Sequence, residues 1–230
     1  MTQGILDRYR SVYSEMEAAC SSCGRNVDDI TLIGVVKGVP PQLVNKAYEA
    51  GVGHFAENYV QEALARERPA LIAGREQSWH LIGHLQRNKV RYIIGRFTLI
   101  HSVDSLLLAR EIAQRACAAH NVQDILLQVK LDSESETKYG VPAEEVVDLS
   151  DAISQLSGVR LKGLMGVAPA GVSNDAIRKS FASLYELYSR LPEPARQVLS
   201  MGMSADFTLA IQEGATHVRV GTALFGPRNR

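Results

Sequence analysis

Eight short apolar runs alternate with amphipathic stretches of helical period along this chain. The runs cover residues 31–36, 52–56, 79–82, 98–103, 125–131, 161–167, 197–201 and 217–220. The stretches of helical period cover residues 4–23, 42–50, 59–73, 87–94, 105–120, 143–156, 175–190 and 207–213. Strands that alternate with helices form parallel sheets, and eight such units in 230 residues fit a closed barrel. We therefore predict an α/β fold, a (β/α)8 TIM barrel with an extra N-terminal helix, in a single domain over residues 1–230.

An open, doubly wound sheet is the alternative arrangement of the same elements. Dinucleotide-binding sheets of that kind carry a G-x-G-x-x-G turn after the first strand. Here the first run is followed by Val36-Lys-Gly-Val-Pro40, which lacks that pattern. The closed barrel is therefore preferred.

The charge balance excludes several classes of function. Lys and Arg together number 25, as do Asp and Glu, so the formal net charge is zero. Nothing in that balance favours a nucleic-acid or membrane-surface partner, and we expect neither. No apolar run approaches the ~18 residues of a membrane span, and the first eight residues do not form a signal peptide. We expect a cytoplasmic protein.

Neither the cysteines nor the histidines form a metal-binding pattern. Cys20-Ser-Ser-Cys23 has the spacing of a zinc or redox pair, but no second pair or nearby histidine completes it. His80 and His84 are four residues apart, yet the residues between them lack the glutamate of a metalloprotease motif. We predict no metal, and a polar role for both histidines near the barrel rim.

A single lysine, Lys37, directly follows the first apolar run. Barrel enzymes place their working groups at the C-terminal ends of strands. A lysine among apolar neighbours is desolvated, which favours its nucleophilic free amine. Taken alone, a lysine in this position is more often an ion-paired residue on the rim, and the phosphate-type loops at the other end of the chain favour the functional interpretation.

Two turns rich in glycine and hydroxyl groups follow the last two apolar runs. The first reads Leu199-Ser-Met-Gly-Met-Ser204, and the second contains Gly221-Thr222. Barrels build phosphate sites from these two loops. Ser204 also has the position of an N-cap for the helix at 207–213, and a capped helix start can bind an anion. A phosphate site with a strand-end lysine favours a phosphorylated aldehyde held as a Schiff base, and pyridoxal 5′-phosphate (PLP) is the leading candidate.

Two further polar residues have structural and functional interpretations. Arg219 lies between Val218 and Val220 on the last strand, so it points to the opposite face from them. An arginine inside a barrel needs either a carboxylate on a neighbouring strand or an acceptor on a ligand, such as a ring nitrogen. Asn58-Tyr-Val-Gln61 has the form of a capping box that opens the second helix.

The longest motifs are Trp79-His-Leu-Ile-Gly-His-Leu-Gln86, Leu199-Ser-Met-Gly-Met-Ser204 and Val218-Arg-Val-Gly-Thr-Ala-Leu-Phe-Gly226. Shorter ones lie at residues 36–37, 57–62, 100–104 and 162–165. In this order and spacing, from about residue 31 to 228, they closely resemble the pyridoxal phosphate homeostasis protein family. The family is a PLP-binding barrel similar to the N-terminal domain of alanine racemase. It acts in vitamin B6 supply and in amino-acid and keto-acid balance, and is regarded as non-catalytic.

The resemblance implies a role for each site residue. Lys37 would hold PLP as a Schiff base, Arg219 would lie near the pyridine nitrogen, and Asn58 would lie close to the cofactor. The phosphate would be held by Ser204, Gly221 and Thr222, and the same pocket would be lined by His80, Met201 and Gly202. This chain departs from the family at Val36, at Gly38-Val39 and at Ala56, all close to the pocket. The lysine and the phosphate residues are kept, so PLP remains the expected cofactor.

Two alternatives stay open beside a PLP-binding protein that is not an enzyme. One is a PLP-dependent amino-acid racemase, and the other is a PLP-free barrel enzyme acting on a phosphorylated sugar or an indole-type metabolite. A two-base racemase needs a second acid–base group, which in alanine racemase comes from the second domain of the partner subunit. Here no such domain is expected after the motif that ends at Gly226, so we predict no catalytic residues. An arginine facing the ring nitrogen also disfavours transamination, because it does not supply a proton to the ring. We expect a monomer, since a closed barrel has no sheet edge, with apo-PLP enzymes as candidate recipients of the cofactor.

Overall fold

Eight parallel strands close into a barrel in chain order in the computed structural model, which describes residues 4–66, 77–131 and 139–227. The strands are β1 (Thr31–Val35), β2 (His54–Glu57), β3 (Ser78–Leu81), β4 (Leu99–Val103), β5 (Gln123–Val129), β6 (Val159–Gly166), β7 (Val198–Met203) and β8 (His217–Val220). The barrel closes where β1 pairs with β8, with Leu32 opposite Val218. The predicted TIM barrel is confirmed, and the open sheet is wrong. All eight strands belong to one barrel, which supports the prediction of a single domain. The single domain stays a prediction.

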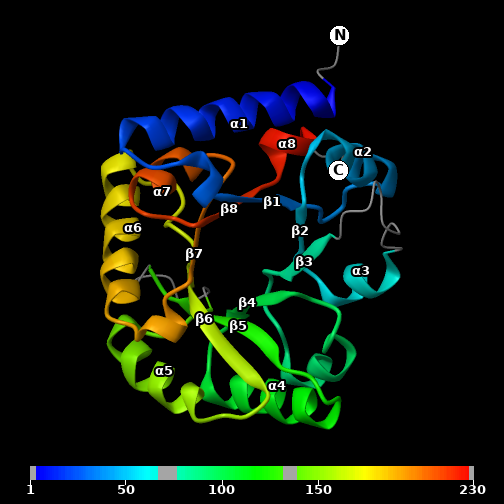
Figure 1. Cartoon of the computed structure of the whole chain (residues 1–230), viewed down its shortest axis with the longest axis vertical. Helices are drawn as coiled ribbons and strands as arrows, with labels where there is room; N and C mark the ends of the chain where they lie inside the picture. The colour runs from blue at the N-terminus through cyan, green and yellow to red at the C-terminus, as the bar shows by residue number, and fades with distance from the viewer. Residues whose placement is uncertain (1–3, 67–76, 132–138, 228–230) are drawn as a thin grey trace.

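Helices surround the barrel (Figure 1). They are α1 (Ile5–Ser22), α2 (Pro41–Ala50), α3 (Val60–Ala65), α4 (Leu106–Ala118), α5 (Val146–Ser154), α6 (Asn174–Ser189), α7 (Phe207–Gln212) and α8 (Thr222–Phe225). The extra helix α1 contacts α2, α7 and α8. It buries Ile5, Val12 and Met16 on one face, at the spacing of an amphipathic helix. This helix therefore covers the outside of the barrel near the seam between its first and last strands.

Three local predictions need correction. The segment predicted as a helix at 87–94 is a 3₁₀ helix, η2 (Arg87–Tyr92), in which only Val90 is buried, so it has no apolar stripe to pack as an α-helix. The helix predicted at 59–73 ends at Ala65, and residues 67–73 lie outside the described residues. The short helix α8 was not predicted, because four residues are too few to show a period.

The barrel interior is unusually polar. Along β2 and β3, Phe55 and Trp79 pack together outside the barrel with ring centroids 5.5 Å apart, while His54 and His80 alternate with them and face inward. One part of the interior is apolar, and there Leu99, Leu126 and Met165 form a small cluster. Elsewhere it holds the buried side chains of His80, His101, Ser200 and Arg219. Barrel interiors are normally filled by branched apolar side chains, so this polar half draws attention to the site above it.

Candidate functional site

A cavity of about 270 Å³ opens at the C-terminal ends of β1, β2, β3, β7 and β8. Its lining residues are Val35, Lys37, Asn58, Ile82, Met203, Ser204, Ala205, Arg219, Gly221 and Thr222. The barrel thus brings together six of the residues singled out in the sequence: Lys37, Asn58, Ser204, Arg219, Gly221 and Thr222. This end of the barrel is where (β/α)8 enzymes carry their active sites.

The half-buried Lys37 is held in place by a clamp on its loop. Arg66 donates hydrogen bonds to the carbonyl oxygens of Val36 at 2.9 Å and Val39 at 3.0 Å, one on each side of the lysine. The Arg66 Nε also donates to the fully buried carboxylate of Glu57 at 2.5 Å. Arg66 ends α3 and turns back to the strand ends, so sequence reasoning, which placed it inside a helix, missed this role.

Ser204 joins the loop after β7 to the loop after β8. Its Oγ accepts hydrogen bonds from the backbone N–H of Gly221 at 3.1 Å and of Ala223 at 3.3 Å. The predicted capping role is wrong, because α7 begins at Phe207 and has Asp206 at its N-cap position. The hydroxyl and N–H groups of both loops therefore converge at the cavity. Hydroxyl and N–H groups of this kind bind phosphate oxygens.

Asn58 presents a buried acceptor at the cavity. Its Oδ1 is buried and has no hydrogen-bond partner among the described residues. The expected capping box is not formed, since the N-cap of α3 is Tyr59 without a side-chain bond. Gly83 allows the next loop to approach, because a Cβ there would lie 1.9 Å from the Asn58 carbonyl oxygen. A buried polar atom without a partner is costly, so a donor on a ligand would stabilise this arrangement.

Arg219 is a buried cation with neutral partners. Its Nη1 donates to Ser200 Oγ at 2.7 Å, and its Nη2 donates to the Gly166 carbonyl oxygen at 2.8 Å. Within the described residues no carboxylate forms an ion pair with it, so the carboxylate partner considered from the sequence is not found. Burial lowers the pKa of Arg219 to about 10, and the more distant Asp206 partly offsets that shift. The cavity therefore carries positive charge that an anionic ligand would compensate.

The remaining predicted site residues lie outside the lining of this cavity. His80 lies inside the barrel and is hydrogen-bonded to His54 at 3.0 Å and His101 at 2.9 Å. Met201 is fully buried in the main apolar core. Gly202 has φ +91°, and a Cβ there would lie 2.6 Å from the Cβ of Ala210, so this glycine lets α7 pack closely on β7.

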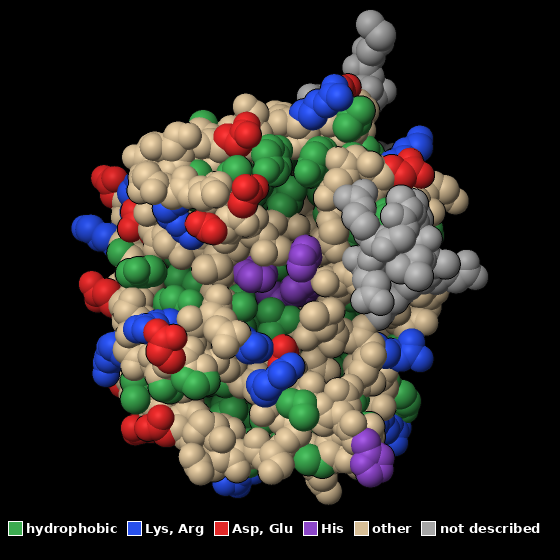
Figure 2. Space-filling view, in the orientation of Figure 1, with side chains coloured by type: hydrophobic (Ala, Val, Ile, Leu, Met, Phe, Trp, Pro, Cys, Tyr) green, Lys and Arg blue, Asp and Glu red, His purple; other side chains and the backbone are tan. Residues whose placement is uncertain are grey.

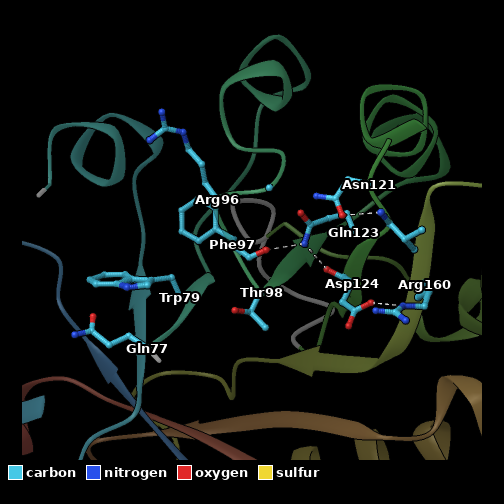
Figure 3. Close-up of a pocket in the computed structure, with 11 residues that line it drawn as sticks. Gln77, Trp79, Arg96, Phe97, Thr98, Asn121, Gln123, Asp124 and Arg160 are labelled. Atoms are coloured by element: carbon cyan, nitrogen blue, oxygen red, sulfur yellow. Dashed lines mark hydrogen bonds and ion pairs between the residues drawn. The ribbon is translucent and has the colours of Figure 1, made fainter. Parts of the chain in front are cut away.

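A second cavity, of about 400 Å³, lies at the opposite end of the barrel, around the starts of β3 to β6 (Figure 3). Figure 3 shows two of its polar contacts: Gln123 donates to the Phe97 carbonyl oxygen, and Arg160 pairs with Asp124 at 2.7 Å. The amide atoms of Gln77 are buried there without a hydrogen-bond partner among the described residues. The N-terminal end of a (β/α)8 barrel serves stability rather than chemistry. The cavity beside Lys37 is therefore the candidate site.

A third cavity, of about 420 Å³, adjoins the candidate site and shares Asn58 with it. Its walls include Tyr59, Lys89 and His84. The ring of His84 stacks on Tyr139 with centroids 3.7 Å apart. This neighbouring cavity leaves room beside the candidate site for a further group.

The fold and the site define the class of this protein, a (β/α)8 barrel with a lysine and two hydroxyl-bearing loops at its C-terminal mouth. The family described as "Alanine racemase, N-terminal domain" matches residues 19–229. A protein of Aquifex aeolicus named pyridoxal phosphate homeostasis protein is 40% identical over 225 residues, which are 96% of this chain and 97% of that protein. The chain belongs to the pyridoxal phosphate homeostasis protein family.

Solved structures agree with this assignment. PipY of Synechococcus elongatus PCC7942 without PLP has 36% identity and a TM-score of 0.84, and covers 96% of this chain and 100% of that one. The same protein with PLP bound has 37% identity and a TM-score of 0.77, and covers 92% and 100% of the two chains. Alanine racemase of Clostridium difficile 630 has a TM-score of 0.76 at 16% identity and covers 97% of this chain but 58% of that one, so it shows a shared fold alone.

Proposed function

We propose that this chain binds PLP in the cavity beside Lys37 and serves PLP homeostasis, in vitamin B6 supply and amino-acid and keto-acid balance, without robust catalytic turnover. The observation that carries the proposal is that one cavity holds a strand-end lysine, the Ser204 and Gly221 loops, and the buried cation Arg219. The names of the Aquifex aeolicus relative and of the PLP-bound PipY structure support it.

The residues that line the cavity beside Lys37 fit the polar groups of PLP. The phosphate dianion would be held by the hydroxyls of Ser204 and Thr222 and by backbone N–H groups of the loop that contains Gly221 and Thr222. Arg219, which has neutral hydrogen-bond partners, would face the ring nitrogen. The unpartnered Oδ1 of Asn58 would accept a hydrogen bond from the ligand or from water bound with it. The Oδ1 of Asn58 is therefore a buried acceptor without a partner among the described residues, and a donor on the ligand would satisfy it.

PLP supplies an aldehyde that condenses with a primary amine. The chain's own contribution is to position the amine of Lys37, through the clamp of Arg66 on the Val36 and Val39 carbonyl oxygens. Arg219 stays protonated at neutral pH, because its pKa of about 10 lies well above that range. A ring nitrogen facing Arg219 would therefore receive no proton from it, and a cofactor held there would be a weaker electron sink than beside a carboxylic acid. These features favour binding of the cofactor over catalysis with it.

The racemase alternative keeps one supporting observation, the fold shared with alanine racemase. Racemisation needs acid–base groups on both faces of the cofactor. The titratable side chains among the described lining residues are Lys37 and Arg219, and the latter is a cation with its donors engaged. The arrangement supports a protein that does not turn over amino acids.

The monomeric state, a cytoplasmic location and apo-PLP enzymes as recipients stay predictions within this proposal. In the described part of the chain, no helix is long and apolar enough to cross a membrane. The closed barrel has no sheet edge to pair with a second copy, which supports a monomer. Light scattering over a range of protein concentrations should give the mass of one chain, 25.2 kDa, and a constant dimer mass would overturn the monomer.

The test of the proposal is the site of covalent attachment. The purified protein should absorb in the visible range, and borohydride reduction followed by peptide mass spectrometry should place the pyridoxyl mass on the peptide that contains Lys37. Lys37→Ala should lose the absorbance, while Lys130→Ala, which removes another lysine at a strand end, should keep it. Attachment at Lys130 or at any other lysine, or a colourless protein that does not bind added PLP, would contradict the proposal.

A further inference from the structure

A chain of hydrogen bonds runs through the barrel interior and ends at Arg219. His54 Nδ1 lies 3.0 Å from His80 Nε2, His80 Nδ1 lies 2.9 Å from His101 Nε2, and His101 Nδ1 lies 2.9 Å from Ser200 Oγ. Arg219 Nη1 donates to the same Ser200 oxygen at 2.7 Å. His80, His101, Ser200 and Arg219 are buried, whereas His54 is half-buried at the start of β2. Figure 2 shows histidine side chains grouped near the centre of the face it presents.

The hydrogen bonds of this series have one consistent donor-to-acceptor direction. Arg219 is only a donor, so it occupies a lone pair of Ser200 Oγ. The other partner of that oxygen among the described residues is His101 Nδ1, and Ser200 is fully buried. The Ser200 hydroxyl hydrogen is therefore satisfied only if it is donated to His101 Nδ1. That bond makes His101 the tautomer with hydrogen on Nε2, which donates to His80 Nδ1, and His80 Nε2 in turn donates to His54 Nδ1.

The direction matters for the buried cation. Every hydrogen in the chain points away from Arg219, so the lone-pair side of each group faces the guanidinium, and hydrogen bonds in series polarise one another. Each ring nitrogen that faces Arg219 is already an acceptor, so a proton added to any ring would break the bond on that side. The charged and titratable groups around the chain are His217, 6.3 Å from the His80 ring centre to centre, Arg219 itself, and Asp206. Burial and the neighbouring rings lower the pKa of His80, and burial also lowers that of His101, which agrees with neutral rings.

We propose that Ser200 and His101 are positioning residues for Arg219, at the head of a polarised chain in which His101, His80 and His54 all carry hydrogen on Nε2. Their effect on the cofactor rests on the proposed function, since Arg219 is expected to face the PLP ring. Among the described residues, no group of three histidine, cysteine or acidic side chains is arranged to hold a metal ion. It fixes the guanidinium through two neutral acceptors, Ser200 Oγ and the Gly166 carbonyl oxygen, and leaves its other N–H groups for the cavity.

The tautomers can be measured directly. Two-bond ¹⁵N–¹H correlation spectra of the protein at neutral pH should show the Nε2–H form for all three rings, assigned with single His→Gln variants. A ring of the chain with hydrogen on Nδ1 would overturn the direction. This measurement needs no cofactor, so it tests the direction of the hydrogen bonds even if the protein fails to bind PLP.

Binding measurements separate positioning from a structural role. Ser200→Ala and His101→Phe should weaken PLP binding about tenfold and leave binding of inorganic phosphate unchanged, because Ser204 and Thr222 rather than Arg219 hold the phosphate. His101→Gln keeps an acceptor and a donor in the same direction and should recover most of the affinity, while His120→Gln, at an exposed side chain, should change nothing. Circular dichroism would confirm that each variant folds. Unchanged PLP affinity in both disruptive variants, or an equal loss for PLP and phosphate, would overturn the proposal.

Discussion

The Ser204 hydroxyl, in the loop after β7, accepts a hydrogen bond from the Gly221 N–H in the loop after β8, 3.1 Å away. The neighbouring N–H of Ala223 donates to the same oxygen at 3.3 Å. Two loops that are 17 residues apart in sequence are thus held as one unit at the cavity. Changes at Ser204 should affect both the contact with a bound phosphate and the arrangement of the second loop.

Removing these hydroxyls should weaken phosphate binding by different amounts. A hydrogen bond to a charged group contributes about 1.5–3 kcal/mol, so Thr222→Ala should raise the PLP dissociation constant roughly ten- to hundred-fold. Ser204→Ala should cost at least as much, because it also releases the second loop. Fluorescence titration with PLP and with inorganic phosphate would measure both. Ser189→Ala, at an exposed hydroxyl on α6, is the matched control. Unchanged dissociation constants in both site variants would place the phosphate elsewhere.

The ion pair between Glu57 and Arg66 should matter for stability and for the lysine loop. The Glu57 side chain is fully buried and that of Arg66 is 9% exposed, so removing one partner leaves a buried charge without compensation. Glu57→Leu should lower the free energy of unfolding by about 3–5 kcal/mol. The double variant with Arg66→Met should recover part of that loss, since neither charge then remains. Urea denaturation of the three proteins would show this, and a double variant less stable than Glu57→Leu would contradict the account.

How far the sequence predicts this site depends on how local each feature is. The position of Lys37 after a strand and the Gly221 turn are local, and alternation along β8 correctly turned Arg219 inward. The partners of Arg219 are not local, because Ser200 lies on β7 and the carbonyl of Gly166 on β6. The bond between His101 and Ser200 joins two strands that are not neighbours in the sheet, so it depends on the closed interior.

The predicted capping roles failed for a related reason. Asn58 and Ser204 have side chains that cap helices readily, so the sequence favoured the nearest helix start. Ser204 instead accepts hydrogen bonds from Gly221 and Ala223, which no sequence spacing places beside it. Arg66 was placed inside a predicted helix, whereas it lies just after the end of α3 and pairs with Glu57, a contact that no sequence spacing indicates.

The half-buried His217 should make the protein less stable in mild acid. Burial, with further contributions from His54 and Arg219, lowers the pKa of His217 to about 4 in the folded protein, whereas an unfolded histidine titrates near 6.5. As the pH falls from about 6.5 to about 4, the unfolded chain takes up a proton that the folded chain does not, so the free energy of unfolding decreases. The contribution of this ring is on the order of 2–3 kcal/mol, fully present above pH 6.5.

Urea denaturation at about pH 7 and pH 4.5 would measure that decrease. His217→Gln should flatten the dependence, because glutamine does not titrate in this range. His120→Gln, at an exposed side chain, should leave it unchanged. A wild-type protein as stable at pH 4.5 as at pH 7 would mean that the rings are not buried in the neutral form.

The last prediction is that the PLP-loaded protein does not turn over amino acids at an ordinary enzyme's rate. Lys37 can exchange a proton on one face of a bound amino acid, and racemisation needs a second group opposite it, each such group contributing roughly a hundred- to ten-thousand-fold. His80, considered for that role from the sequence, is bonded to His54 and His101 inside the barrel. His84 lines the adjoining cavity, where its ring stacks on Tyr139 and its Nδ1 lies 3.4 Å from Asp104.

Incubation with L-alanine in deuterium oxide, followed by chiral chromatography and NMR at the α-carbon, would measure turnover. We expect racemisation well below about 1 s⁻¹, the low end of ordinary enzymes. Solvent can supply the second proton only slowly, because no positioned group on the described lining of the cavity delivers it. A rate at or above that value, lost in Lys37→Ala and also in His84→Gln but kept in His120→Gln, would make His84 the second base and the protein a racemase.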